Sequence, residues 1–311
     1  MEDNAQLLKN IQNAVKAIQT SDIGSSVLSR QKQSQFVRTV SEATRILDDA
    51  RQINMNSHTY DIDRIGFASR FMRGANEGED PEETSKPNFD TNTLEAKELI
   101  AIAGFTDSTL EDNIEGENFE NTLLTLIADR SGVDLEELFL NGDRDSSDSL
   151  LQVIDGWLKK AANELDGGAS EPDFDTEDVE TMFDEMINGI DKKYLRRRED
   201  WKLYVHWDIE DSYRNLLRDR GTGLGDSAQT QANRLAYKGF EIVDSSSMPE
   251  GNALLVPRSN LVYGMYRDVR IEPDRKPRQR LTDFITTMRV DCHYEDENAA
   301  IVAKGFEGSS S

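Results

Sequence analysis

The pattern of apolar and polar positions is clearest between Phe105 and Asp143. Apolar residues recur there at close to 3.6-residue spacing, at Phe119, Leu123, Leu126, Ile127, Val133, Leu135 and Leu138. Asn141-Gly142-Asp143 follows directly, and glycine readily adopts the left-handed conformation found after a helix. The pattern predicts one long amphipathic helix with a polar approach, which ends at this turn and needs a partner for its apolar face.

Two extended segments precede this helix. Apolar residues follow a less helical pattern from Ile53 to Met72 and again from Phe89 to Ile102, and residues 73–87 between them are rich in Gly, Pro and acids. We interpret this arrangement as a long β-hairpin with a polar tip. Because a two-stranded ribbon is only marginally stable in water, we expect this hairpin to lie on a partner.

The N-terminal fifty residues carry two weak helical stripes, Leu7–Ile18 and Phe36–Leu47, separated near Gly24. They contain too few apolar residues for a core of their own, so we expect these helices to dock on something else.

The part of the chain after Asp143 mixes helical and strand patterns. Helices are predicted over 150–162, over 177–187 and from Tyr213 toward a glycine-rich loop. Strands are predicted at 201–209, 240–243, 253–256, 261–266, 269–271, 284–292 and 299–303, with a charged loop up to Arg280. This order, with strands from distant segments and no βαβ alternation, predicts an α+β fold.

Composition makes the chain unusual. It has 60 acidic and 36 basic residues, a net charge of −24, and only 36% hydrophobic residues, with a mean hydropathy of −0.67. This balance disfavours nucleic-acid binding through a basic face. Arginine also outnumbers lysine. Since molar salt would screen the self-repulsion, we hypothesise a halophilic source, with an ordinary acidic mesophilic protein as the alternative.

Candidate chemistry is sparse. Asp173-Phe-Asp-Thr-Glu177 begins like a calcium loop, but Asp178 stands where that loop requires Gly and Asp184 where it requires Glu. The segment Gly221–Gly225 lacks the Lys-Ser/Thr of a phosphate loop. The three histidines and the single Cys292 form no metal pattern. We therefore predict no catalytic, cofactor-binding or metal-ligating residue. The sequence also shows neither a membrane-spanning run nor a secretory signal.

Several segments, taken in order, resemble the HK97-type major capsid proteins of tailed double-stranded DNA viruses. The predicted helix ending in Leu140-Asn-Gly-Asp143 resembles their spine helix, and Asp155-Gly-Trp-Leu158 resembles the segment that follows it. Met248–Gly264 and Arg289–Val302 resemble the return to the peripheral domain and its closing strand. The resemblance covers about residues 50–306, and its weight lies in the order and spacing of these segments.

The resemblance implies a division of the chain. Residues 1–51 would form an N-terminal arm and 52–95 an extended loop built as a β-hairpin. Residues 96–150 and 251–306 would form a peripheral domain with the spine helix, 151–250 an axial domain, and 307–311 a flexible tail. A Lys–Asn crosslink, known in one branch of the family, is not assigned, because Lys86 lies near the predicted tip but no partner Asn is identified.

The function implied is that of a shell subunit assembling with itself into hexamers and pentamers around double-stranded DNA, without sequence-specific binding. Portal, scaffolding and decoration or turret proteins would be further partners. The protein would reside in the virion and assemble in the host cytoplasm. The acidic composition suggests that this host is a halophilic archaeon. Expected inter-subunit contacts are Phe67, Phe71 and Phe89 on the hairpin, and Arg275, Lys276, Arg278 and Arg280. The alternatives are an encapsulin-like compartment and an acidic metal-binding or hydrolytic enzyme that uses residues 164–185.

Overall fold

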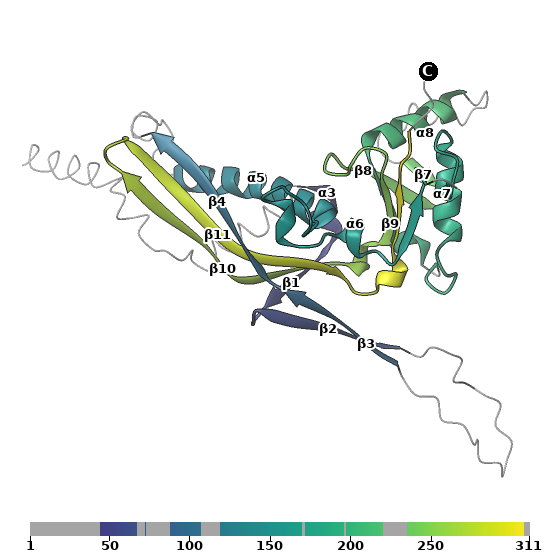
Figure 1. The fold of residues 1–311 in the computed structure, drawn as a ribbon, viewed down its shortest axis with the longest axis horizontal. Helices are drawn as coiled ribbons and strands as arrows, with labels where there is room; N and C mark the ends of the chain where they lie inside the picture. The colour runs from purple at the N-terminus through teal and green to yellow at the C-terminus, as the bar shows by residue number, and fades with distance from the viewer. Residues whose placement is uncertain are drawn as a thin grey trace, which may run out of the picture.

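A four-stranded sheet and one long helix form the first of two packed regions. The computed structural model describes residues 44–66, 72, 88–106, 119–169, 172–195, 197–219 and 235–307. In it the sheet has the order β1 (Arg51–Met55), β10 (Leu261–Lys276), β11 (Leu281–Tyr294) and β4 (Lys97–Thr106). β1 pairs parallel with β10, while β11 pairs antiparallel with β10 and β4. The helix α5 (Phe119–Asn141) lies beside this sheet (Figure 1).

The helix α5 confirms the predicted spine over Phe119–Asn141. Phe139 is fully buried, and its ring centroid lies 5.6 Å from those of both Trp157 and Tyr263. The amide of Gly142 donates to the carbonyl of Leu138 at 2.8 Å and closes the helix. Two details of the prediction are wrong. Phe105 belongs to strand β4, and the Leu126 side chain is 59% exposed instead of lying on the buried face.

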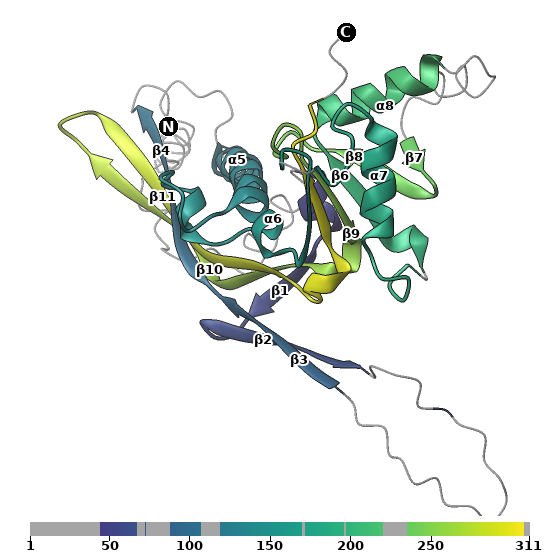
Figure 2. The same ribbon diagram turned by 45° about the vertical axis from the view of Figure 1, so that its right-hand side comes forward.

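A six-stranded sheet forms the second region. Its order is β5 (Asn163–Asp166), β12 (Ile301–Lys304), β9 (Ala253–Pro257), β6 (Trp201–Val205), β8 (Phe240–Asp244) and β7 (Leu235–Tyr237). Helices α7 (Val179–Asn188) and α8 (Trp207–Asp219) pack on it (Figure 2). α7 confirms the helix predicted over 177–187.

Strand alternation makes the six-stranded sheet a wall between two hydrophobic cores. Along β9, Leu254 and Val256 face the core that contains α5, whereas Ala253 and Leu255 face the core beneath α7 and α8. The same alternation runs along β12. Strands β9 and β12 therefore pack against both regions, and this explains why residues 253–256 and 301–303 are all apolar.

Two predicted elements are wrong in extent. Residues 150–162 form the short turns η2 (Leu151–Val153) and α6 (Trp157–Lys160) instead of one helix. They are separated at Gly156, where any Cβ would come within 2.6 Å of the Leu140 carbonyl. The strand predicted over 201–209 ends at Val205, because the His206 carbonyl accepts from the Ile209 amide and begins α8.

The predicted hairpin is present as β2 (Thr59–Gly66) and β3 (Asn88–Glu95), which project from the body (Figure 1). It is shorter at its base than the pattern suggested, since β4 is a separate strand of another sheet. Of the N-terminal stripes, only α3 (Arg45–Asp49) lies within the described residues, and its Ile46 and Leu47 are fully buried.

The charged segment before Arg280 is also different from the prediction. It continues strand β10 as far as Lys276, and only residues 277–280 form the turn into β11. Short 3-10 turns η3 (Arg198–Asp200), η4 (Arg258–Asn260) and η5 (Glu297–Ala299) complete the described elements. The mixture of two helix-covered sheets confirms the α+β class.

Candidate subunit interface

One face of the β2–β3 hairpin anchors it to the body. Ile62 and Leu94 are buried against Val262 of strand β10. The Asn92 side-chain amide donates to the Tyr294 carbonyl at 2.9 Å, and Arg64 forms an ion pair with the mostly buried Asp296. These contacts hold the hairpin at a fixed angle, so that its other face is presented to solvent.

The outward face of the hairpin carries two kinds of cross-strand pair. Nearer the body, Thr93 donates to Asp61 at 2.7 Å and Thr91 donates to Asp63 at 2.9 Å. Beyond them, Ile65 and Phe89 stand opposite each other and are 66% and 67% exposed. We call Ile65 and Phe89 the apolar rung of the hairpin. Cross-strand apolar pairs of this size are normally covered.

The apolar rung contains one residue that the sequence analysis expected at an interface and one that it did not propose. Phe89 was expected at an interface, while Phe67 and Phe71 lie outside the described residues. Ile65 was not proposed, although it alternates with Asp61 and Asp63 on the same face. The two-residue period of the strand therefore places Ile65 on this outward face, once its pairing with Phe89 is known.

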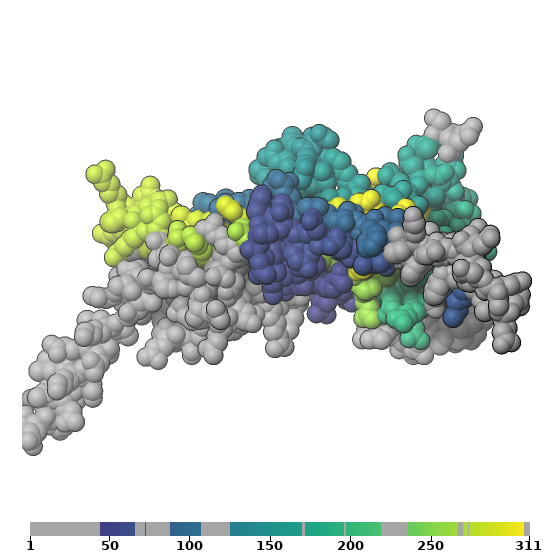
Figure 3. All heavy atoms as spheres, turned by 90° about the horizontal axis from the view of Figure 1, so that it is seen from below, coloured from purple at the N-terminus to yellow at the C-terminus, as the bar shows by residue number. Residues whose placement is uncertain are grey.

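The four basic residues expected at an interface form the tip of the β10–β11 hairpin. Arg275, Lys276, Arg278 and Arg280 are all exposed there, at one end of the molecule (Figure 3). Lys276 pairs with Asp283 at 2.5 Å, and that hydrogen bond raises the lysine pKa. Arg280 has a φ of 49°, so the turn is closed by a left-handed residue other than glycine. This tip lies away from strand β3, which carries Phe89 (Figure 1).

The sheet β1-β10-β11-β4 has a second exposed apolar surface. On strand β4, Leu99, Ala103 and Phe105 pack toward the α5 core, whereas Ile100 and Ile102 point the other way and are 64% and 63% exposed. Strand β11 places Ile285 directly beside Ile102. We call Ile100, Ile102 and Ile285 the apolar sheet face. Nothing in the sequence pattern alone distinguished Ile100 from a core residue.

The apolar sheet face is bordered by charge. Arg289 on β11 pairs with Glu98 on β4, with its Nη2 atom 2.8 Å from the carboxylate. Within one chain, the apolar rung and the apolar sheet face do not cover each other, since Ile65, Phe89, Ile100 and Ile102 each remain about two-thirds exposed and only Ile285 is partly buried. A chain with two such uncovered surfaces has a means of binding another copy of itself.

The structure shows the surroundings of segments that the sequence analysis considered for metal or phosphate binding. No group of three or more His, Cys, Asp or Glu residues there could hold a metal ion. The calcium-like stretch leads into α7, where the Asp178 carboxylate caps the helix by accepting from the Glu180 amide at 2.9 Å. Asp178 thus has a structural role as the cap of α7. The glycine-rich segment Gly221–Gly225 lies outside the described residues.

Two further residues from the sequence analysis have structural surroundings. Cys292 is fully buried, and that burial raises its thiol pKa. His206 lies at the end of β6 with its Nδ1 2.9 Å from Asp208. Among the helices described, none is both long and apolar enough to cross a membrane.

Comparison with known proteins agrees with this arrangement. A prophage capsid protein of Bacillus subtilis (strain 168), YqbE, is 33% identical over 302 residues, covering 93% of this chain and 95% of that protein. Two solved structures share the fold at 17% identity. One is from a satellite phage P4 procapsid that includes the size determination protein (TM-score 0.62, 87% of this chain and 98% of that one). The other is from the capsid of an empty GTA particle (TM-score 0.59, 84% and 89%).

The family comparison covers most of the chain. The model of the phage capsid family matches residues 24–305, which include every element described above from α3 to β12. With the two sheets, the spine helix and the projecting hairpin, the architecture is that of the HK97-like phage capsid proteins. The chain belongs to the phage capsid family.

Proposed function

We propose that this chain is the repeating subunit of an icosahedral shell, built from hexamers and pentamers, that encloses a double-stranded DNA genome. The observation that carries the proposal is the pair of uncovered apolar surfaces. The apolar rung of one copy would pack on the apolar sheet face of the next. Such a head-to-tail contact closes into rings under rotational symmetry.

Energetics favour this use of the two surfaces. Burying a large apolar side chain contributes about 1.5–3 kcal/mol. Each contact would bury Ile65 and Phe89 of one copy against Ile100 and Ile102 of the next. A single contact of this size is modest. Repetition around a closed ring and then over a shell converts modest contacts into a stable container.

Charge shapes the same proposal. Copies that carry −24 each repel one another, and the exposed basic tip, Arg275–Arg280, is where a neighbour's acidic surface would be attracted. A shell made of acidic subunits does not exclude packaged DNA, because counterions screen the negative charge of both the protein and the DNA. The shell would bind DNA without sequence specificity. Assembly would take place in the host cytoplasm. Portal, scaffolding and decoration or turret proteins would be further partners.

The domain division expected from the resemblance is part of the proposal. Residues 1–51 act as the arm, 52–95 as the extended loop, 96–150 with 251–306 as the peripheral domain, 151–250 as the axial domain and 307–311 as a tail. One structural fact qualifies the division: β9 and β12 hydrogen-bond within the sheet of β6 and β8. We therefore propose that the peripheral and axial parts move as a single body.

The test is deletion of residues 74–86 at the end of the hairpin. Electron microscopy of the purified wild-type protein should show closed particles. The deletion variant should remain a folded subunit, with an unchanged unfolding midpoint, and form no particles. Normal particles from the deletion variant would contradict the role given to the hairpin in assembly. A wild-type protein that stays a discrete monomer or dimer with enzymatic turnover would contradict the shell itself.

Two finer points stay predictions. An encapsulin-like compartment would have the same subunit contacts but hold protein cargo; terminase, portal and protease genes beside this one would favour a virus. The halophilic archaeal host rests on composition alone, and a known relative comes from Bacillus subtilis. Unfolding measured against KCl concentration tests it, since full stability in dilute buffer would contradict a halophilic origin.

A further inference from the structure

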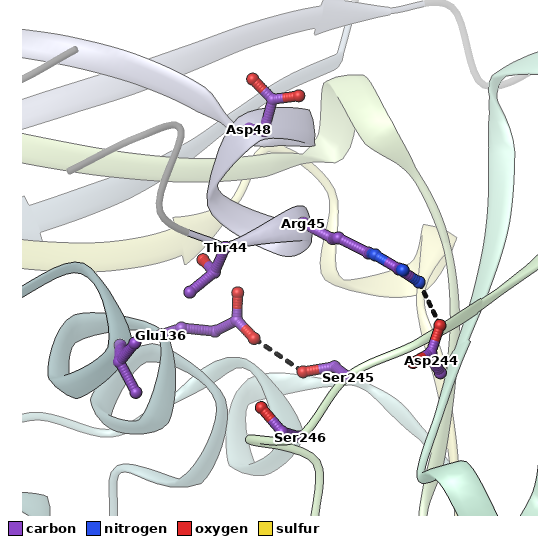
Figure 4. A pocket seen from close by; sticks show the side chains of 8 residues that line it. Thr44, Arg45, Asp48, Glu136, Asp244, Ser245 and Ser246 are labelled. Atoms are coloured by element: carbon purple, nitrogen blue, oxygen red, sulfur yellow. Dashed lines mark hydrogen bonds and ion pairs between the residues drawn. The ribbon is translucent and has the colours of Figure 1, made fainter. Parts of the chain in front are cut away.

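A buried carboxylate lies where three segments of the chain meet. Glu136, on α5, is only 2% exposed and sits between α3 and the turn that follows β8 (Figure 4). One carboxylate oxygen accepts from the Ser245 hydroxyl at 2.6 Å, and the other accepts from the Ile46 amide at 3.3 Å. Within the described residues, Glu136 has no basic partner, because the neighbouring Arg45 is directed to Asp244. A buried charge without a cation is costly unless it is hydrogen-bonded.

The bond to Ile46 takes the place of a missing helix cap. The first amides of a helix need acceptors from outside the helix, usually the side chain of the N-cap residue. Thr44 occupies that position in α3, but its side chain makes no capping hydrogen bond. Its buried hydroxyl has no partner among the described residues. Glu136 therefore supplies from the spine helix the acceptor that α3 does not supply itself.

The same side of α5 holds the turn after β8. The Ser245 hydroxyl donates to Glu136 and accepts from the Ser247 amide at 3.2 Å. The Asn141 side chain, further along α5, donates to the Ser247 carbonyl at 2.8 Å. Glu136 thus joins the base of the N-terminal arm to a turn that is already fixed.

The other end of α3 is held independently. The Asp49 carboxylate accepts from Lys202 at 2.6 Å and from the Tyr204 hydroxyl at 3.0 Å. A five-residue helix has little stability of its own, so it is held by its buried Ile46 and Leu47 and by these polar attachments at its two ends. Removing Glu136 would release only the end nearer residues 1–43.

We propose that Glu136 is a positioning residue: by capping α3 from the spine helix, it fixes the first turn of α3 against the subunit body. Its consequence for particles rests on the proposed function, in which residues 1–51 act as an arm that contacts neighbouring copies. The reach of the side chain matters more than its charge, since a neutral oxygen in the same place can accept from the Ile46 amide.

Hydrogen exchange of the Ile46 amide in the full-length unassembled subunit tests the cap. Glu136→Gln keeps an oxygen in reach and should change the exchange rate less than about threefold. Glu136→Asp keeps the charge but is one methylene shorter, and Glu136→Ala has no acceptor. Both should speed exchange about tenfold or more, which is the order of effect expected for a hydrogen bond to a charged group.

Two controls separate the cap from general unfolding. Glu137→Ala changes the exposed neighbour on the same helix and should leave the Ile46 amide unchanged. The Gly142 amide, bonded to the Leu138 carbonyl, should stay protected in every variant. If Glu136→Ala does not fold, the comparison of Gln with Asp decides. Unchanged exchange in Glu136→Asp, or loss of protection in Gln with retention in Asp, would overturn the proposal.

Electron microscopy of the same variants tests the consequence for assembly. The Gln variant should form particles of wild-type size, and the Asp and Ala variants should form aberrant particles or none. Normal particles from variants with a freed Ile46 amide would overturn the assembly consequence. If the wild-type protein forms no particles, the proposed function fails, but the exchange result on Glu136 stands by itself.

Discussion

Phe139 and Phe89 are the same side chain in opposite surroundings. Phe139, on the spine helix, is fully buried between Trp157 and Tyr263, whereas Phe89, on the hairpin, is 67% exposed opposite an equally exposed Ile65. The first completes its contacts within one chain. The second is mostly exposed, and in the proposed function it is buried by another copy of the chain.

This difference separates the residues that stabilise the folded subunit from those that we propose bind neighbouring subunits. The two cores on either side of the β9–β12 wall are buried within one chain, whereas the apolar rung and the apolar sheet face are the surfaces that we propose for assembly. Substitutions in the cores should therefore change the stability of the subunit. Substitutions on the exposed surfaces should change the concentration at which subunits assemble.

Phe139→Ala should have the largest effect of all. Truncating a fully buried aromatic leaves a cavity and typically costs about 3–5 kcal/mol of unfolding free energy. Denaturant unfolding of the unassembled subunit measures it. A cost below about 1 kcal/mol would show that the spine-helix core is looser than the ring contacts indicate.

Phe89→Ala should behave in the reverse way. Because the side chain is exposed in the subunit, the unfolding free energy should change by no more than about 0.5 kcal/mol. The assembly contact should lose about 1.5–3 kcal/mol, which raises the assembly concentration by roughly ten- to a hundredfold per contact. Light scattering against protein concentration measures this rise.

The matched control is Thr59→Ala, at the base of the same hairpin face and also exposed. It should leave both stability and assembly unchanged. If Phe89→Ala destabilised the subunit as much as Phe139→Ala, the distinction between a folding core and an assembly surface would fail.

The contrast between the two phenylalanines also shows what the sequence could reveal. Helical spacing located the spine helix, and its Asn-Gly-Asp stop was placed correctly because Gly142 closes the helix. The break at Gly156 was not foreseeable, because it depends on the Leu140 carbonyl packed against it in space. Ile100 was indistinguishable from a core residue, since a strand shows two faces and only tertiary packing decides which one is covered.

The candidate interface and Glu136 could also be predicted only in part from the sequence. The cluster of basic residues before β11 was visible as composition, but its form as a strand ending in a tight turn was not. Glu136 was hidden among many acids, because the sequence does not show that it meets the Ile46 amide.

Reversing charge at the basic tip should have a smaller effect than Phe89→Ala. Exposed ion pairs contribute about 0.2–1 kcal/mol each and are screened by salt. Arg278→Glu with Arg280→Glu should raise the assembly concentration at low salt, and the difference from wild type should shrink as salt rises. Arg278→Lys with Arg280→Lys keeps the charge and should assemble normally. An effect that does not vary with salt would argue against an electrostatic contact.

The smallest effect concerns acid at the turn that ends the spine helix. The hydrogen bond from Lys159 lowers the pKa of the Asp143 carboxyl below its usual value of 3.8. A lowered pKa stabilises the folded state above the unfolded pKa, and this contribution is lost as pH falls through the folded pKa. Stability should therefore decline below about pH 4, and Asp143→Asn should show less of this decline in an acid titration followed by unfolding. An identical decline in both proteins would assign it to other carboxylates.

The central claim is that the apolar rung of one copy packs on the apolar sheet face of another. Two single variants, Phe89→Cys and Ile102→Cys, test it most directly, since the native Cys292 is fully buried. Mixed under oxidising conditions during assembly, they should form a disulfide-linked dimer that neither variant forms alone in comparable yield. Particles that assemble normally from the mixture without any such dimer would contradict the account.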